Sequence, residues 1–201
     1  MKKYKFDPWV GAKYSNGVSN LKVMVIKDDY FCNSSVEFNT SFMTNQIEDF
    51  IDEYNEVKDF MEPFIRLERI CTGNELDTIN RIVFWNSIAV YNFIQHTLQN
   101  NLQRISKEAL IHSNKRFLEI LEIHQPDCLL IWGDELYSHL SQCGFFDIKM
   151  DRKDNPSFQI WTNTNTNYKI NAVMKIFKLT TKSTAKDLNT ILRLQLQFPT
   201  L

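Results

Sequence analysis

A pair of carboxylates follows the first strongly apolar segment of the chain. Asp28 and Asp29 come just after residues 21–26, which read Leu-Lys-Val-Met-Val-Ile. A carboxylate at the end of a strand can act as a general base, or can stabilise a cation that develops during a reaction. The same residues can also form an acidic turn or a helix cap, so on their own they leave both interpretations open.

Amide side chains supply a second kind of group. Asn92 comes near the end of an apolar run, and Asn163 and Asn165 lie in a Thr/Asn run at 162–167. An amide carries both a donor and an acceptor, so it can pair with a complementary edge of a ligand. Alternatively, Asn92 caps a turn and the Thr/Asn run is a polar loop that bonds to its own backbone.

Strands and helices that alternate along the chain must position these groups. Buried strands are predicted at 21–26, 128–132 and 158–161, and helices at 47–64, 106–124, 134–142 and 185–196, whereas 82–94 fits either structure. This alternation predicts a three-layer α/β/α fold with a central, mostly parallel sheet of four to five strands. Ligands bind such sheets beyond the carboxyl ends of the strands, here after Ile26, Trp132 and Trp161.

The composition is typical of one globular domain that spans 1–201. The 201 residues are 43% hydrophobic and 23% charged, and no apolar run approaches the roughly 20 residues of a membrane span. The opening residues lack the apolar segment of a signal peptide, so we expect a cytoplasmic protein without membrane contact. The four cysteines form no CxxC pair and the four histidines no HExxH motif. We therefore expect reduced structural thiols, no metal and no cofactor.

Charge is unevenly distributed although the net charge is only −1. Residues 37–77 hold eleven acids and three bases, and residues 168–201 hold six bases and one acid. A basic end can provide a phosphate-binding face, and an acidic stretch can provide a surface for a protein partner. Both blocks can equally be solvated helix faces.

Residues 26–30, Ile-Lys-Asp-Asp-Tyr, resemble the first motif of the uracil-DNA glycosylase superfamily. That motif reads G-Q-D-P-Y in the main branch and G-I-N-P in the mismatch-specific branch. The resemblance gives Asp28 the catalytic position, and gives Tyr30 the position of the tyrosine that screens the 5-position of a pyrimidine.

Three further segments resemble the same superfamily in the correct order. Residues 90–93, Val-Tyr-Asn-Phe, resemble the segment that ends in the base-reading asparagine. Residues 106–133 resemble the Ser-Lys-x-x-Leu helix, the Gln-Pro and the glycine-terminated strand of the mismatch-specific branch. Residues 162–167 occupy the place of the second motif, H-P-S or N-P-S, and residues 7–11 resemble the opening of a bacterial glycosylase-like branch.

The resemblance implies a monofunctional DNA N-glycosylase that flips uracil or a modified base out of DNA and excises it. Asp28 would stabilise the sugar cation or activate water, and Asn163 or Asn165 would stabilise the anionic base. Asn92 would read the N3–H and O4 edge of the base, with Phe38 or Phe42 stacked on it. The phosphate contacts would come from the lysines that follow the second motif: Lys169, Lys175, Lys178 and Lys182.

Two other classes of function stay open. Ile26 in place of the glycine, and the absence of H-P-S, favour a glycosylase-fold module that has lost catalysis. Such a module would bind nucleic acid, a nucleotide or, through residues 37–77, a protein partner. The remaining class is an unrelated doubly wound domain that binds a small ligand. The relative positions of Asp28, Asn92 and the Asn163–Asn165 loop discriminate between these classes.

Overall fold

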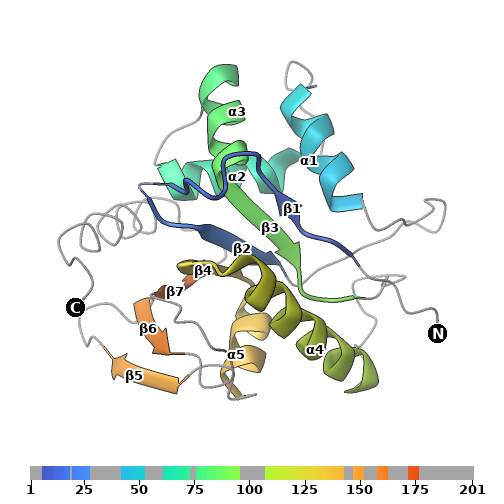
Figure 1. Ribbon diagram of the computed structural model, residues 1–201, viewed down its shortest axis with the longest axis vertical. Helices are drawn as coiled ribbons and strands as arrows, with labels where there is room; N and C mark the ends of the chain where they lie inside the picture. Colours follow the sequence, from blue (N-terminus) through green and yellow to red (C-terminus); the bar gives the residue numbers. More distant parts are fainter. Residues whose placement is uncertain are drawn as a thin grey trace.

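A sheet of seven strands forms the centre of the computed structural model, in the spatial order β1-β3-β2-β4-β7-β6-β5 (Figure 1). The structure describes residues 6–18, 20–27, 42–52, 61–72, 76–95, 107–142, 147–151, 158–162 and 172–176. The strands are β1 (Trp9–Val10), β2 (Val23–Lys27), β3 (Ile88–Asn92), β4 (Cys128–Trp132), β5 (Asp147–Asp151), β6 (Phe158–Thr162) and β7 (Ala172–Ile176). The helices are α1 (Phe42–Asp52), α2 (Glu62–Thr72), α3 (Thr78–Ser87), α4 (Lys107–His124) and α5 (Asp134–Gln142).

The middle of the sheet is parallel and its margins are antiparallel. β3, β2, β4 and β7 are neighbours that run in the same direction. β1 pairs antiparallel with β3, and β6 pairs antiparallel with both β7 and β5. The predicted mixed α/β class with a mostly parallel sheet is therefore confirmed. The expected width of four to five strands was too small, because the short β1 and the outer strands extend the sheet on both sides.

Apolar side chains cover both faces of β2, β3 and β4. In β2, Val23 and Val25 join one buried cluster, while Met24 and Ile26 join another on the opposite face. Successive residues of a strand point to opposite faces, so a continuous apolar run means that both faces are buried. This explains why 21–26 and 128–132 were recognisable as strands from the sequence.

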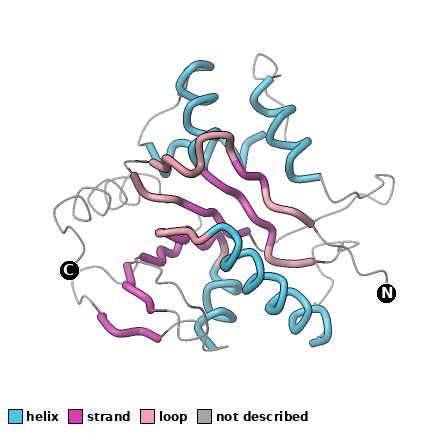
Figure 2. Tube along the Cα trace, viewed as in Figure 1, coloured by secondary structure: helices cyan, strands magenta, loops and turns pink. Residues whose placement is uncertain are grey.

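Helices pack on both faces of the sheet. The first cluster combines residues of α1, α2 and α3 with one face of β2, β3 and β4, and the second combines residues of α4 and α5 with the other face. In Figure 2 β2 and β3 cross the centre of the molecule, with α1, α2 and α3 above them and α4 and α5 below. No helix in the described ranges is long and apolar enough to span a membrane.

One helical prediction needed correction, two are confirmed, and one ambiguous run is resolved. The single helix expected at 47–64 is replaced by α1 and α2, with residues 53–60 outside the described ranges. The ambiguous run 82–94 contains both structures, because α3 ends at Ser87 and β3 begins at the next residue. α4 and α5 lie where the sequence predicted them, and the helix expected at 185–196 lies outside the described residues.

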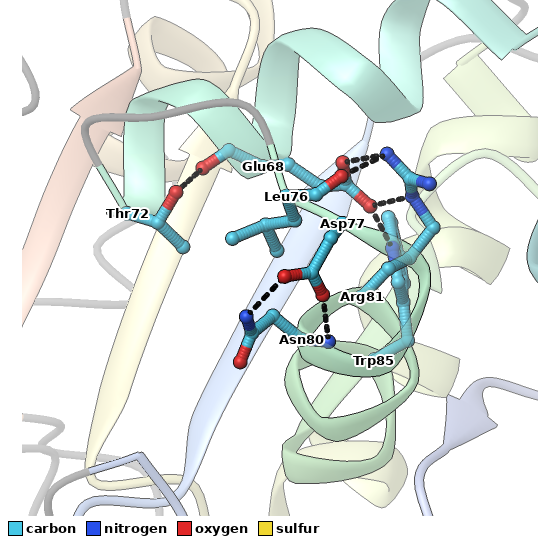
Figure 3. A network of polar contacts seen from close by, with 7 residues as sticks. All are labelled: Glu68, Thr72, Leu76, Asp77, Asn80, Arg81 and Trp85. Carbon is cyan, nitrogen blue, oxygen red and sulfur yellow. Dashed lines mark hydrogen bonds and ion pairs between the residues drawn. The ribbon is translucent and has the colours of Figure 1, made fainter.

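A buried ion pair joins α2 to α3 (Figure 3). Arg81 donates from Nε to Glu68 Oε1 at 2.7 Å and from Nη2 to Oε2 at 2.9 Å, and both side chains are fully buried. Trp85 Nε1 donates to Glu68 Oε1 at 2.8 Å, and Arg81 Nη2 also donates to the carbonyl of Leu76 at 3.0 Å. Asp77 caps α3 by accepting from the backbone N–H of Asn80. These bonds fix the two helices against each other.

Candidate functional site at the carboxyl edge of the sheet

The four parallel strands end level with one another. Lys27 of β2 lies opposite Asn92 of β3 on one side and Trp132 of β4 on the other. Ile176, the last residue of β7, lies opposite Trp132. The carboxyl ends therefore form one edge, where α/β proteins bind their ligands.

The direction of the connections singles out one place on this edge. After β2 the chain leads through α1–α3 to β3, whereas after β4 it continues into α5, on the opposite face. Neighbouring strands whose connections depart to opposite sides define a topological switch point, and ligands bind beside such points. Here the switch point lies between Lys27 and Trp132.

Lys27, Asn92 and Trp132 share a face of the sheet. Residues two and four positions before each of them belong to the cluster beneath α1–α3, and Trp132 packs against that cluster itself. Since side chains alternate along a strand, all three residues are on this face. Neighbouring strands are about 4.8 Å apart, which brings an amine, an amide and an indole together at the switch point.

The ammonium group of Lys27 lies between two aromatic rings. Its Nζ is 5.4 Å from the ring centroid of Phe64, in α2, and 5.4 Å from that of Trp132. Cations are attracted to the faces of aromatic rings at this range. Phe64 is itself held by Phe50 and Trp85, whose ring centroids are 5.3 and 5.5 Å away. The lysine is thus positioned by rings from two elements.

Asn92 is buried, and one of its side-chain atoms has no partner among the residues that the structure describes. Its Nδ2 donates to the carbonyl of Ile94 at 2.9 Å, while Oδ1 accepts no hydrogen bond from the described residues. A buried polar atom without a partner costs about 1–3 kcal/mol and calls for an explanation. Tyr14, Tyr91 and Arg116 also have such atoms within the described ranges, but they lie toward α4. Asn92 differs because it ends a strand at the ligand-binding edge.

Gln95 holds the backbone around Asn92 in place. Its Nε2 donates to the Asn92 carbonyl at 2.8 Å, and its Oε1 accepts from the backbone N–H of Phe6 at 2.8 Å. Its own backbone N–H donates to Ser113 Oγ of α4 at 3.1 Å. In addition, Phe93 donates from its backbone to the Lys27 carbonyl at 2.8 Å. The segment after β3 is therefore tied to β2, to α4 and to the start of the chain.

Gly133 makes the turn from β4 into α5 beside the site. Its φ of 130° lies in a region that residues with a side chain rarely adopt. The turn lets α5 begin at Asp134, one residue after the turn that follows β4, as the sequence predicted.

The structure describes three of the predicted site residues. Asn92 is at the candidate site, Phe42 is the first residue of α1, and Lys175 lies within β7 opposite Ile131. Lys175 therefore belongs to a strand in the middle of the sheet. Outside the described residues lie Asp28, Tyr30, Phe38, Asn163, Asn165, Lys169, Lys178 and Lys182. Asp28 directly follows Lys27 in the sequence.

The expected role of 158–161 as another strand ending at the ligand-binding edge is wrong. β6 is a strand, but it runs antiparallel to β7, with Phe158 opposite Met174 and Gln159 opposite Val173. Since β7 is parallel to β4, the carboxyl end of β6 points to the opposite edge of the sheet. The neighbour of β4 that does end at the site edge is β7, whose last residue is Ile176.

Sequence reasoning missed Lys27, Phe64 and Trp132 as members of the site. Lys27 was quoted only as part of the segment 26–30 that resembles the first motif, and Trp132 only as the last residue of the strand predicted at 128–132. The sequence signal for Lys27 and Trp132 was their position two residues after Val25 and Leu130. Residues two apart in a strand lie on the same face, so this spacing places both side chains on one face of the sheet. The contact with Phe64 depends on how α2 packs, which no local pattern specifies.

Titratable groups elsewhere are perturbed mainly by burial. Desolvation raises the pKa of the Cys128 thiol to about 12 and raises that of Cys71 as well, so both thiols are protonated and unreactive. Burial lowers the pKa of His124 and His139, which favours the neutral rings. The described ranges contain no group of three His, Cys, Asp or Glu side chains that could hold a metal ion.

Comparison with known proteins gives no relative: no protein-family model matches the sequence, and no curated protein matches it.

Proposed function

We propose that the protein binds an unpaired or flipped pyrimidine base of DNA at the carboxyl edge and hydrolyses its N-glycosidic bond. The observation that carries the proposal is the buried Oδ1 of Asn92, which has no partner among the described residues, beside the switch point. An N–H on the edge of a base would satisfy this acceptor and recover about 1–3 kcal/mol of desolvation cost. The second hydrogen of Nδ2 would donate to the neighbouring base oxygen.

The sequence supplies a carboxylate next to this amide. Asp28 follows Lys27, which lies opposite Asn92. Breaking the glycosidic bond generates positive charge on the sugar, and a carboxylate either stabilises that charge or accepts a proton from the attacking water. With helices on both faces of the sheet, this arrangement supports a three-layer fold of the uracil-DNA glycosylase type.

Base release from synthetic DNA tests the proposal. Single- and double-stranded oligonucleotides with uracil and a panel of modified pyrimidines are incubated with excess protein, and free base is measured by chromatography. Asp28→Asn should slow release by about 10²–10⁴-fold, the usual contribution of a general base. Asp49→Asn is the matched control, since Asp49 is an exposed carboxylate of α1, and it should leave the rate unchanged. The absence of release across the whole panel would refute the proposal.

The direction of β6 favours a second candidate function. If the Thr/Asn run does not reach the edge where Asn92 lies, the amide at the second motif is missing and the site binds a base without cleaving the bond. This alternative predicts DNA binding that weakens with salt and depends on Asn92, with no free base formed. An Asn92→Ala variant would then lose affinity, whereas Asn80→Ala, at the exposed start of α3, would not.

A further inference from the structure

We propose that Lys27 is the group that stabilises the departing base. This inference rests on the proposed function. It assigns to the Lys27 amine the stabilisation of the anionic base, which the resemblance gives to Asn163 or Asn165. β6 runs antiparallel to β7 and so ends at the opposite edge of the sheet. The amide residues within 162–167 therefore do not follow a strand that ends at the site. A positively charged group on the neighbouring strand is already present there.

The register places Lys27 beside any base that Asn92 holds. The two residues are opposite each other in neighbouring parallel strands and share a face. If Asn92 Oδ1 accepts from N3–H of a pyrimidine, the carbonyl oxygen O2 is attached to the adjacent ring carbon. Strands are about 4.8 Å apart, so the flexible lysine side chain can reach that oxygen from the next strand.

Its surroundings keep the ammonium group at the edge. The ring centroids of Phe64 and Trp132 are each 5.4 Å from Nζ, and these contacts orient the cation. A preorganised cation stabilises charge that develops in a transition state more effectively than solvent does, because it needs little reorganisation.

The reaction balances with water as the only co-reactant. The bond between C1′ of the sugar and N1 of the base breaks, and both electrons leave with the base. The resulting negative charge is shared between N1 and O2, where the Lys27 ammonium stabilises it. The oxygen of a water molecule bonds to C1′, its proton passes to the Asp28 carboxylate, and the released base finally takes up that proton.

A leaving-group comparison tests this role. Single-turnover rates of the full chain and of Lys27→Met are measured on DNA containing the pyrimidine that the protein releases and on DNA containing its 5-fluoro derivative. Fluorine makes the base a better leaving group without changing its hydrogen-bonding edge. Lys27→Met, which keeps the apolar stem between the two rings, should slow release of the parent base by about 10²–10³-fold. The loss should be clearly smaller for the fluorinated base.

The ratio of the two losses remains informative if the variant is only partly folded, because the active fraction cancels. Lys22→Met is the matched control: it precedes the same strand at the opposite edge and should change neither rate. Equal losses on both substrates would show a merely structural role and overturn the assignment, as would an unchanged rate in Lys27→Met. If the unaltered protein releases no base at all, the proposed function fails and this role fails with it.

Discussion

Replacing Glu68 by Gln should remove a large part of the stability of the fold. Its carboxylate accepts three hydrogen bonds at 2.7–2.9 Å, two from Arg81 and one from Trp85, and both members of the ion pair are fully buried. The substitution removes the Glu68 charge that lies against the buried Arg81 guanidinium. Breaking a buried pair in this way costs about 3–5 kcal/mol. Native domains are stable by about 5–15 kcal/mol, so the loss is a substantial share.

The same helix provides the control. Glu62 pairs with Arg66 at 2.6 Å, but the two side chains are 46% and 39% exposed. Exposed pairs four residues apart contribute about 0.3–0.5 kcal/mol, because water screens the charges. Glu62→Gln therefore makes the same chemical change in α2, but its expected loss of stability is about a tenth of that of Glu68→Gln.

Urea unfolding followed by tryptophan fluorescence measures both variants. With a slope of about 2 kcal/mol per molar urea, Glu68→Gln should lower the unfolding midpoint by about 1.5–2.5 M. Glu62→Gln should lower it by about 0.2 M on the same scale. In the double variant of Glu68→Gln and Arg81→Met, the cost should be less than the sum of the two single changes by more than about 1 kcal/mol, because no unpaired guanidinium remains. Additive costs, or equal midpoints for the two glutamate variants, would refute the reasoning.

Buried groups elsewhere give three more expected outcomes. Gln95→Ala should lower the free energy of unfolding by about 2–4 kcal/mol in urea titrations, since it removes the side-chain partner of the buried Phe6 N–H and of the Asn92 carbonyl. Cys128, 1% exposed and with its pKa raised to about 12 by burial, should react with a thiol reagent only as fast as the protein unfolds. Stability should be fully present above about pH 6.5 and should fall below it, because burial lowers the folded-state pKa of His124 and His139 and the unfolded chain protonates first. Melting temperatures between pH 7.5 and 5.5 should decline less when both histidines are replaced by Gln.

The sequence predicted the elements in which burial alone determines the pattern of apolar and polar residues. β2 and β4 are buried on both faces and so appear as continuous apolar runs. The run 82–94 was ambiguous because Phe84 and Trp85 face the core from a helix, whereas Val90 does so from a strand. β7 was missed because Lys175 made the segment resemble part of a basic tail.

The candidate site was harder to predict because it depends on strand order and direction. Asn92 was found, since it follows an apolar run that ends at the site. The contact of Lys27 with Trp132 requires β2 and β4 to be adjacent, and this adjacency is decided by the crossover connection that runs from β3 past β2 to β4. Similarly, no local pattern shows that β6 runs antiparallel to β7. Pairing between distant segments determines both features.

The buried ion pair and the candidate site belong to one continuous packing unit. Phe64 and Glu68 are four residues apart in α2, so they lie on the same side of that helix. Glu68 anchors Trp85 through its indole N–H, and Trp85 packs edge-on against Phe64, which in turn contacts the Lys27 ammonium. The buried ion pair carries a desolvation cost, but it also holds α2 in its orientation over the carboxyl edge. An apolar pair could fill the same space, but it would lack the directional bonds that set the angle of the indole ring.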